Sequence, residues 1–179
     1  ARKKGLHINL AVGYGGRRLG ARPAAALRAI ALGRGVGGHT MSHGGLVGLP
    51  AGRVRAEVGE TRSIIATLTG ETAVWVRPRG GKSDASAREV VRSMGMAIAL
   101  WDAYAGDTAP SPRADTTASR VLAMAQPGSI ILLHETNPET VTPLPRIIAG
   151  LRAKGLRPVT LSEMFGRSPA RTGRSPFVR

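Results

Sequence analysis

The chain has 179 residues, which favours one domain with a real hydrophobic core over two comfortable ones. It contains no cysteine, which excludes disulfide bonds, thiolate metal ligands and a cysteine nucleophile, so a bound metal must be held by His, Asp or Glu. The formal net charge of +15 comes mainly from arginine and would attract an anionic partner, although a coding bias towards Arg, Ala and Gly gives the same picture.

The residues before His39 predict the end of a helix, a strand and a second helix. Residues 1–5 resemble the last turn of a helix closed by Gly5, and residues 6–12 form an apolar run typical of a buried strand. Pro23 is suited to a helix start, and good helix formers continue over residues 24–32. Because the printed sequence starts at a helix end, we expect it to be N-terminally incomplete.

The middle of the chain continues the alternation. Residues 54–68 predict an amphipathic helix ended by Gly70, and residues 73–76 predict a strand. Ser83 and Asp84 predict the cap of a helix that runs to about Met94, and residues 96–101 predict the next strand.

The C-terminal part predicts two further helix and strand pairs and then a tail. Asp115 and Thr116 are expected to cap a helix to Ala125, followed by a strand at residues 129–133. A helix at residues 143–154 and a strand at residues 157–161 complete the pattern, and residues 167–179 predict a flexible basic tail. Short strands that alternate with helices predict an α/β protein with parallel strands in a barrel or a doubly wound sheet.

The stretch His39-Thr40-Met41-Ser42-His43 places two histidines four residues apart. On one face of a helical turn, two imidazoles at this spacing can hold one divalent metal ion. The alternative is a pair of surface or capping histidines, because two histidines at this spacing arise often by chance.

Four polar sites each follow the predicted carboxyl end of a different strand. These sites are His39, Arg77, the loop from Trp101 to Asp107, and His134. In barrels of parallel strands that end carries the chemistry, so we expect the four sites to converge on one cleft.

Four motifs in this order resemble the polysaccharide deacetylase family, also called carbohydrate esterase family 4, over residues 3–165. His39 to His43 matches the metal-binding H-S/T-x-x-H motif, and Arg77 to Gly81 is similar to R-P-P-Y-G. Trp101-Asp102 with Asp107-Thr108 resembles the family's fourth motif, and Leu132-Leu133-His134 matches L-x-H. The order and spacing agree throughout, which makes the resemblance specific.

The sequence also departs from the family pattern. The family's first motif, T-F-D-D-G, supplies a metal-binding aspartate and a catalytic base, and it would lie before Arg2, so the printed sequence lacks it. Thr108 replaces the tryptophan that walls the acetyl pocket in the family, and Gly80 replaces the tyrosine of the third motif. Gly80 can still offer a backbone N–H to an oxyanion.

The resemblance implies a fold and an activity. The expected fold is a distorted (β/α) barrel of parallel strands of the deacetylase type, lacking the first strand, over residues 1–166. The expected activity is metal-dependent hydrolysis of N-acetyl groups on an amino-sugar polymer, either peptidoglycan or a chitin-like glycan. The expected partner is therefore an N-acetylated glycan and not a nucleic acid, with no membrane span and an extracellular or cell-envelope location.

The resemblance also implies residue roles. His39 and His43 would hold a divalent metal, expected to be zinc, and His134 would protonate the leaving amine with Asp107 tuning it. Arg77 would normally orient the catalytic aspartate of the first motif. The residues expected to contact substrate are Gly80, Trp101 and Leu132.

Several alternatives remain open at this stage. Asp102 or Asp107 is a candidate to replace the missing carboxylate. His134 is otherwise a strand-end histidine, Arg77 a surface charge and Trp101 a core residue, and His7, which matches no motif, is taken as structural. At the level of the whole chain, a non-catalytic glycan-binding or scaffold domain competes with the enzyme. A basic protein that binds nucleic acid is disfavoured by its scattered arginines and by 3% aromatic content.

Overall fold

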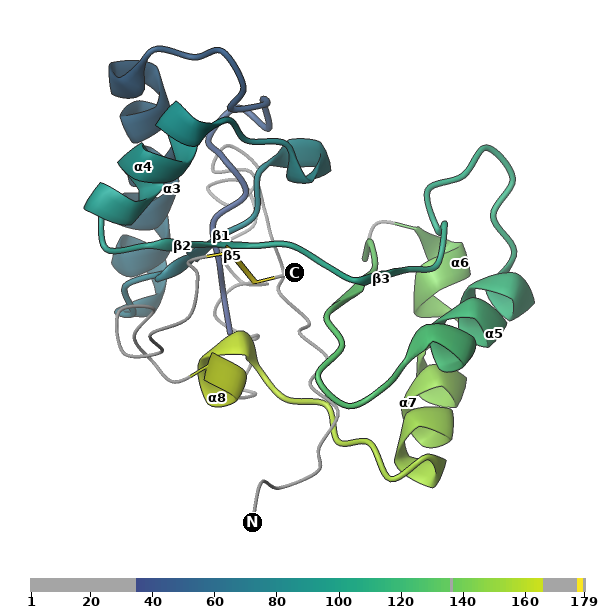
Figure 1. Ribbon diagram of the computed structural model, residues 1–179. Coiled ribbons are helices and arrows are strands. Elements are labelled where there is room, and N and C mark those ends of the chain that lie inside the picture. Colours follow the sequence, from purple (N-terminus) through teal and green to yellow (C-terminus); the bar gives the residue numbers. More distant parts are fainter. Residues whose placement is uncertain (1–34, 136, 166–176, 179) are drawn as a thin grey trace. The chain divides into compact units, whose positions relative to one another are not determined.

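The computed structural model describes residues 35–135, 137–165 and 177–178. These residues fall into two compact units, which are described one at a time (Figure 1). The first unit contains residues 35–100 together with Phe165 and residues 177–178, and the second contains the described part of residues 101–164. The predicted N-terminal elements and His7 lie outside the described residues.

The first unit is a parallel sheet with two helices. Its elements are α3 (Ala51–Thr69), β1 (Trp75–Val76), η1 (Arg79–Gly81), α4 (Ala85–Ser93), β2 (Ala97–Ala99) and β5 (Phe177–Val178). The strand order is β1-β2-β5, all parallel, with Trp75 opposite Ala97 and Ile98 opposite Phe177. Gly38 adds a parallel bridge to Val76, so the chain that leads to His39 runs along the edge of this sheet.

The cap before α4 and the end of α3 agree with the sequence prediction, whereas α3 begins earlier than predicted. Asp84 precedes α4 and its Oδ1 accepts the backbone N–H of Ala87 at 2.8 Å, which confirms the predicted cap. Gly70, in the left-handed region at φ 72°, closes α3, which begins one turn earlier than predicted, after Pro50. The two helices lie side by side (Figure 1). Their apolar faces share one buried cluster with the sheet, formed by Leu46, Val54, Val58, Val76, Ala87, Val90, Val91, Met96 and Ile98.

The second unit contains a strand pair and a group of helices. Its elements are β3 (Ala103–Tyr104), α5 (Ala114–Met124), β4 (Ile131–Leu132), α6 (Pro138–Val141) and α7 (Leu144–Ala153). The helix α8 (Leu161–Phe165) follows, and all of it except its last residue belongs to this unit. The strands β3 and β4 are parallel, with Ala103 opposite Ile131. The helix α5 packs against α6, α7 and β3 (Figure 1). The buried cluster of this unit is formed by Ala103, Ala105, Ala118, Val121, Ala125, Ile131, Ile147, Leu151 and Leu156.

Two sequence predictions in this unit are wrong. The predicted strand at residues 157–161 is absent, because Thr160 and Glu163 form a capping box that starts α8. The N–H of Thr160 donates to Glu163 Oε2 at 2.7 Å, and the N–H of Glu163 donates to Thr160 Oγ1 at 3.1 Å. Asp115 does not cap α5. Instead, Glu139 Oε2 accepts the N–H of Ala114 at 2.6 Å.

The described strands bear out a mixed α/β protein with parallel pairing. They form a sheet of β1, β2 and β5 and a pair of β3 and β4, and no closed barrel is formed among them. Of the predicted tail, residues 177–178 form β5 and the remainder lies outside the described residues. Among the helices of the described chain, none has both the length and the apolar character that a bilayer crossing needs.

Candidate functional site

The segment from His39 to His43 is a bent loop and not a helical turn. Thr40 and His43 have φ values of 61° and 60°, in the left-handed region that residues other than glycine seldom adopt. The prediction that the two histidines share one face of a helical turn is therefore wrong. The loop nevertheless brings the two rings together, with centroids 4.9 Å apart and planes at 67°.

The sheet, α3 and α4 hold this loop. The N–H of Ser42 donates to Oε2 of Glu57, a buried residue of α3, at 2.8 Å. The N–H of Gly48 donates to Oδ2 of Asp84 at 2.7 Å, so the residue that caps α4 also ties down the end of the loop. Hydrogen bonds from the backbone N–H groups of Ala87 and then Gly48 lower the pKa of Asp84 below its ordinary value. The strained loop is thus fixed by carboxylates on two helices.

A hydrogen bond to Arg77 orients the His39 imidazole. The Nδ1–H of His39 donates to the backbone carbonyl oxygen of Arg77, at the end of β1, and the N–H of Arg77 donates to the carbonyl oxygen of Gly38 at 2.9 Å. Donation through Nδ1 fixes the neutral tautomer that carries its lone pair on Nε2. Metal-binding histidines show this arrangement, in which the second ring nitrogen donates to a carbonyl oxygen. The sequence predicted a role for the Arg77 side chain but missed this role of its backbone.

The histidine pair fits part of a metal site. Two neighbouring imidazoles, one of them with a fixed tautomer, are suitable nitrogen donors for a divalent ion. Within the described part of the chain, no group of three or more His, Asp or Glu residues is placed to hold a metal. The pair could therefore hold a metal through two nitrogen ligands, and a complete site would need at least one more.

Gly80 lies in the turn that follows β1. It belongs to the short η1 helix, is exposed, and has φ 63°, so a side chain at this position would be strained. The backbone here thus favours the glycine that stands where the family motif has tyrosine.

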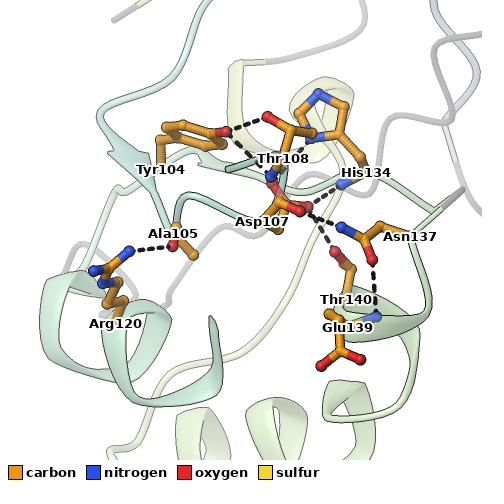
Figure 2. A network of polar contacts seen from close by, with 9 residues as sticks. All are labelled: Tyr104, Ala105, Asp107, Thr108, Arg120, His134, Asn137, Glu139 and Thr140. Atoms are coloured by element: carbon orange, nitrogen blue, oxygen red, sulfur yellow. Dashed lines mark hydrogen bonds and ion pairs between the residues drawn. The ribbon is translucent and has the colours of Figure 1, made fainter. Parts of the chain in front are cut away.

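The second unit contains a buried aspartate paired with a histidine (Figure 2). Asp107 is fully buried, and its Oδ1 lies 3.0 Å from Nδ1 of His134. Its Oδ2 accepts the backbone N–H of His134 at 2.6 Å and the hydroxyl of Thr140 at 2.7 Å. The amide of Asn137 donates to the backbone carbonyl oxygen of Asp107. Both carboxylate oxygens of Asp107 are thus engaged.

The pKa of Asp107 is set by opposing effects. Burial by itself raises the pKa, but hydrogen bonds from the His134 ring, the Thr140 hydroxyl and the His134 backbone lower it by more, so the net pKa lies below the ordinary value. The group is a buried carboxylate, and it holds the His134 ring by Nδ1 with Nε2 at the opposite side of the imidazole. The His134 side chain is 29% exposed. A buried carboxylate on one nitrogen of a half-exposed imidazole is the arrangement of an oriented general acid or base.

The pair stands where two parallel strands end. Asp107 follows β3, a short strand that the sequence analysis did not predict and that lies inside the stretch taken as a loop, and His134 follows the predicted strand β4. Within this unit the two polar groups therefore lie beyond the carboxyl ends of neighbouring parallel strands. The sequence analysis missed Asn137, which caps α6, and Thr140, which lies within that helix. The pair Asn137-Pro138 could have predicted the start of α6, since Asn is a common helix cap and Pro a common first residue of a helix.

The family model for polysaccharide deacetylase matches residues 7–99, slightly more than half of the 179 residues. The chain belongs to the polysaccharide deacetylase family. Its relatives include the peptidoglycan-N-acetylglucosamine deacetylase of Bacillus cereus, 32% identical over 140 residues that make up 76% of this chain and 50% of that protein. The chitooligosaccharide deacetylase of Rhizobium leguminosarum bv. trifolii is 30% identical over 152 residues, 85% of this chain and 67% of that protein. The chain thus spans half the length of the Bacillus cereus relative.

Solved structures of the family have the same fold. A family 4 acetyl xylan esterase from Clostridium thermocellum, in complex with a cobalt ion, has a TM-score of 0.79 at 26% identity, covering 88% of this chain and 79% of that one. A family pseudoenzyme from Bacillus anthracis has a TM-score of 0.82 at 20% identity, covering 90% of this chain and 65% of that one. The fold is therefore that of a polysaccharide deacetylase, and it is shared by proteins described as esterase and as pseudoenzyme.

The other predicted site residues of this family member are placed as follows. Asp102 is hydrogen-bonded to Ile130, the residue before β4. Its Oδ2 accepts the N–H of Ile130 at 3.1 Å, and its own N–H donates to the Ile130 carbonyl oxygen at 3.1 Å. Trp101 and Leu132 are half-buried. The structure gathers Asp107 and His134 in one unit and His39, His43 and the Arg77 backbone in the other. Their convergence on one cleft stays a prediction.

Proposed function

We propose that the chain is a metal-dependent polysaccharide deacetylase domain that hydrolyses N-acetyl groups of an amino-sugar polymer, peptidoglycan or chitin-like. The observation that carries this proposal is the buried Asp107 carboxylate on Nδ1 of His134, in a chain of this family. Relatives named for peptidoglycan and for chitooligosaccharides support both substrate classes. By the same relationship to cell-wall enzymes, the proposed location is the cell envelope.

His134 is the proposed general acid. Deacetylation of an amide releases an amine, which must gain a proton as the carbon–nitrogen bond breaks. Asp107 orients the ring through Nδ1, so that the nitrogen opposite the carboxylate faces the substrate and donates the proton.

His39 and His43 are the proposed ligands of a divalent metal. Nitrogen donors suit zinc, and the family member from Clostridium thermocellum was solved with cobalt. When bound, such an ion supplies Lewis acidity that polarises the amide carbonyl and acidifies water. The chain's own contribution is to fix the His39 tautomer through the Arg77 carbonyl and to hold the loop through Glu57.

The remaining predicted roles belong to the same proposal. The Gly80 backbone N–H would serve a developing oxyanion. Trp101 and Leu132 would contact the glycan, and the Arg77 guanidinium would orient an aspartate of the family's first motif. These roles assume a distorted (β/α) barrel, in which the carboxyl ends of all strands face one cleft.

The proposal requires a further metal ligand and a catalytic base. Neither oxygen of Asp107 is available for these tasks, since both already accept hydrogen bonds in a buried setting. Asp102 is exposed, and its Oδ2 accepts the backbone N–H of Ile130, so it stays a candidate for one of these tasks. A second candidate function is a glycan-binding or scaffold domain without catalysis. A protein of the same fold is described as a family pseudoenzyme, so the fold alone does not decide between the two functions.

Metal titration and acetate release test the proposal together. The metal-free chain is titrated with zinc by calorimetry, and acetate release from acetylated chito-oligomers is measured for the chain and for a version extended by an Asp-Asp strand. We expect weak zinc binding and little release from the chain, an increase of both on extension, and loss of the increase in His39→Ala.

Ser42→Ala is the matched control, because Ser42 contributes its backbone N–H to the Glu57 contact and the substitution leaves that group in place. Equal activity with and without His39 would refute the metal assignment. An extended chain that binds the glycan but releases no acetate would establish the scaffold alternative.

A further inference from the structure

An exposed aromatic ring, that of Tyr104, lies beside the Asp107–His134 pair. Tyr104 is the last residue of β3, and it is 38% exposed whereas its neighbours Ala103 and Ala105 are buried. Its ring centroid lies 6.3 Å from that of the His134 imidazole, with the planes at 80° (Figure 2). Because side chains alternate along a strand, the Tyr104 ring points away from the side on which its neighbours are buried, and there it lies beside the imidazole.

The hydroxyl end of Tyr104 is fixed by Thr108. The phenol oxygen and the Thr108 hydroxyl are hydrogen-bonded, and the N–H of Thr108 donates to the phenol oxygen at 3.3 Å. The ring is thus attached at both ends, by β3 and by the loop that carries Asp107. Such attachment orders a large apolar surface without burying it in the core.

The position of the ring matches the position of a sugar. Because Asp107 holds Nδ1, proton transfer from His134 uses Nε2, and the amide nitrogen of the substrate must come within about 2.6–3.2 Å of that atom. The sugar carbon that bears this nitrogen is one bond further away, which brings the pyranose within reach of an aromatic ring centred 6.3 Å from the imidazole. Apolar C–H faces of a pyranose pack well on an aromatic side chain, as is usual in ligand sites.

We propose that Tyr104 is a substrate-binding residue, the aromatic platform for the sugar ring whose nitrogen His134 protonates. The inference rests on the proposed function, since it takes His134 as the acid. It adds a sugar-binding residue that the sequence motifs do not indicate.

Two consequences distinguish a platform from other roles. The contact is made before and during the reaction alike, so its loss raises KM and leaves kcat nearly unchanged. The contact involves the sugar ring and not the acetyl group, so acetylated and deacetylated oligomers lose affinity equally.

Calorimetric titration of the chain with acetylated and with deacetylated chito-oligomers at one salt concentration tests the proposal. Tyr104→Ala should weaken binding of both oligomers by about tenfold, the scale of a lost apolar contact of this size. Tyr104→Phe keeps the ring and should stay within about twofold of the original affinity, since a polar contact at the surface contributes little. Met124→Ala is the matched control, because Met124 is 37% exposed in the same unit.

Three results would overturn the platform. These are unchanged binding in Tyr104→Ala, a loss confined to the acetylated oligomer, and equal losses in Tyr104→Phe and Tyr104→Ala. Failure of the proposed function is distinguishable, because it shows as absent acetate release from a chain that still binds both oligomers, whereas the platform is judged by binding alone. Binding of neither oligomer by the unsubstituted chain would also overturn the platform. Far-UV and thermal denaturation curves identical to those of the unsubstituted chain establish that each variant is folded.

Discussion

Replacing Thr140 by valine tests whether α6 stabilises the buried Asp107 carboxylate. Thr140 is 3% exposed, and its hydroxyl donates to Asp107 Oδ2 at 2.7 Å. Valine keeps the shape of the side chain and removes the donor, which leaves a buried carboxylate oxygen with one fewer hydrogen bond. A hydrogen bond to a charged group contributes about 1.5–3 kcal/mol, so the free energy of unfolding at pH 7 should fall by that amount.

The same substitution should change the pH dependence of stability. The folded-state pKa of Asp107 is lowered, so its ionised form stabilises the fold above the ordinary pKa of an aspartate, and this contribution is lost as the pH falls through the folded-state value. Thr140→Val removes part of the cause of that lowering. The difference between the two chains should therefore be largest near pH 7 and shrink in acid, towards the about 0.5–1.5 kcal/mol of a neutral hydrogen bond.

Urea denaturation at a series of pH values measures both effects. Thr142→Val, at an exposed position directly after α6, is the matched control and should change the unfolding free energy by less than about 0.5 kcal/mol. A loss for Thr140→Val that is the same at every pH, or no loss at all, would refute the view that its hydroxyl stabilises the Asp107 carboxylate.

Three further predictions concern the first unit. His43→Gly should weaken zinc binding at least about tenfold, which a zinc titration measures. The free energy of unfolding should not fall, because glycine adopts φ 60° without strain. Urea denaturation measures it, and a large loss of stability would contradict this prediction. Gly80→Ala should lower the free energy of unfolding by about 1 kcal/mol, as measured by urea denaturation. Open space surrounds this position, so the cost is the strain of a positive φ alone. An unchanged denaturation midpoint would contradict this prediction. Asp84→Asn should make the chain lose less stability as the pH is lowered from about 5 through the folded-state pKa of Asp84. The reason is that the pKa of Asp84 is lowered in the fold, so its ionised form stabilises the fold above the ordinary value. Acid denaturation followed by circular dichroism tests this, and superimposable curves of the two chains would exclude it.

Most helices could be predicted from the sequence, because the residues that start and end a helix lie next to it in the chain. Asp84 before α4 and Gly70 after α3 each act within one turn of the chain, and the structure has both. The predicted strand at residues 157–161 failed although its capping residues were present. The apolar residues there were taken as a strand, whereas Thr160 and Glu163 form a capping box that begins a helix.

The motif order determined the family and named Asp107 and His134, because residue types at fixed spacing are visible in one dimension. The supporting residues were not visible, since their contacts join positions far apart in the chain. Glu57 reaches Ser42 from α3, and Thr140 reaches Asp107 from α6.

The histidine pair shows most clearly what local sequence determines and what only the folded structure determines. The spacing of His39 and His43 indicated that the rings would meet, and they do, but a helical turn was the wrong means. The backbone takes two left-handed residues that nothing local favours, and the sheet edge, the Arg77 carbonyl and the Glu57 carboxylate hold it there. Local sequence thus determined which groups were available for chemistry. Tertiary contacts decided their tautomer, their burial and their orientation, because these properties depend on atoms that the chain brings together only when folded.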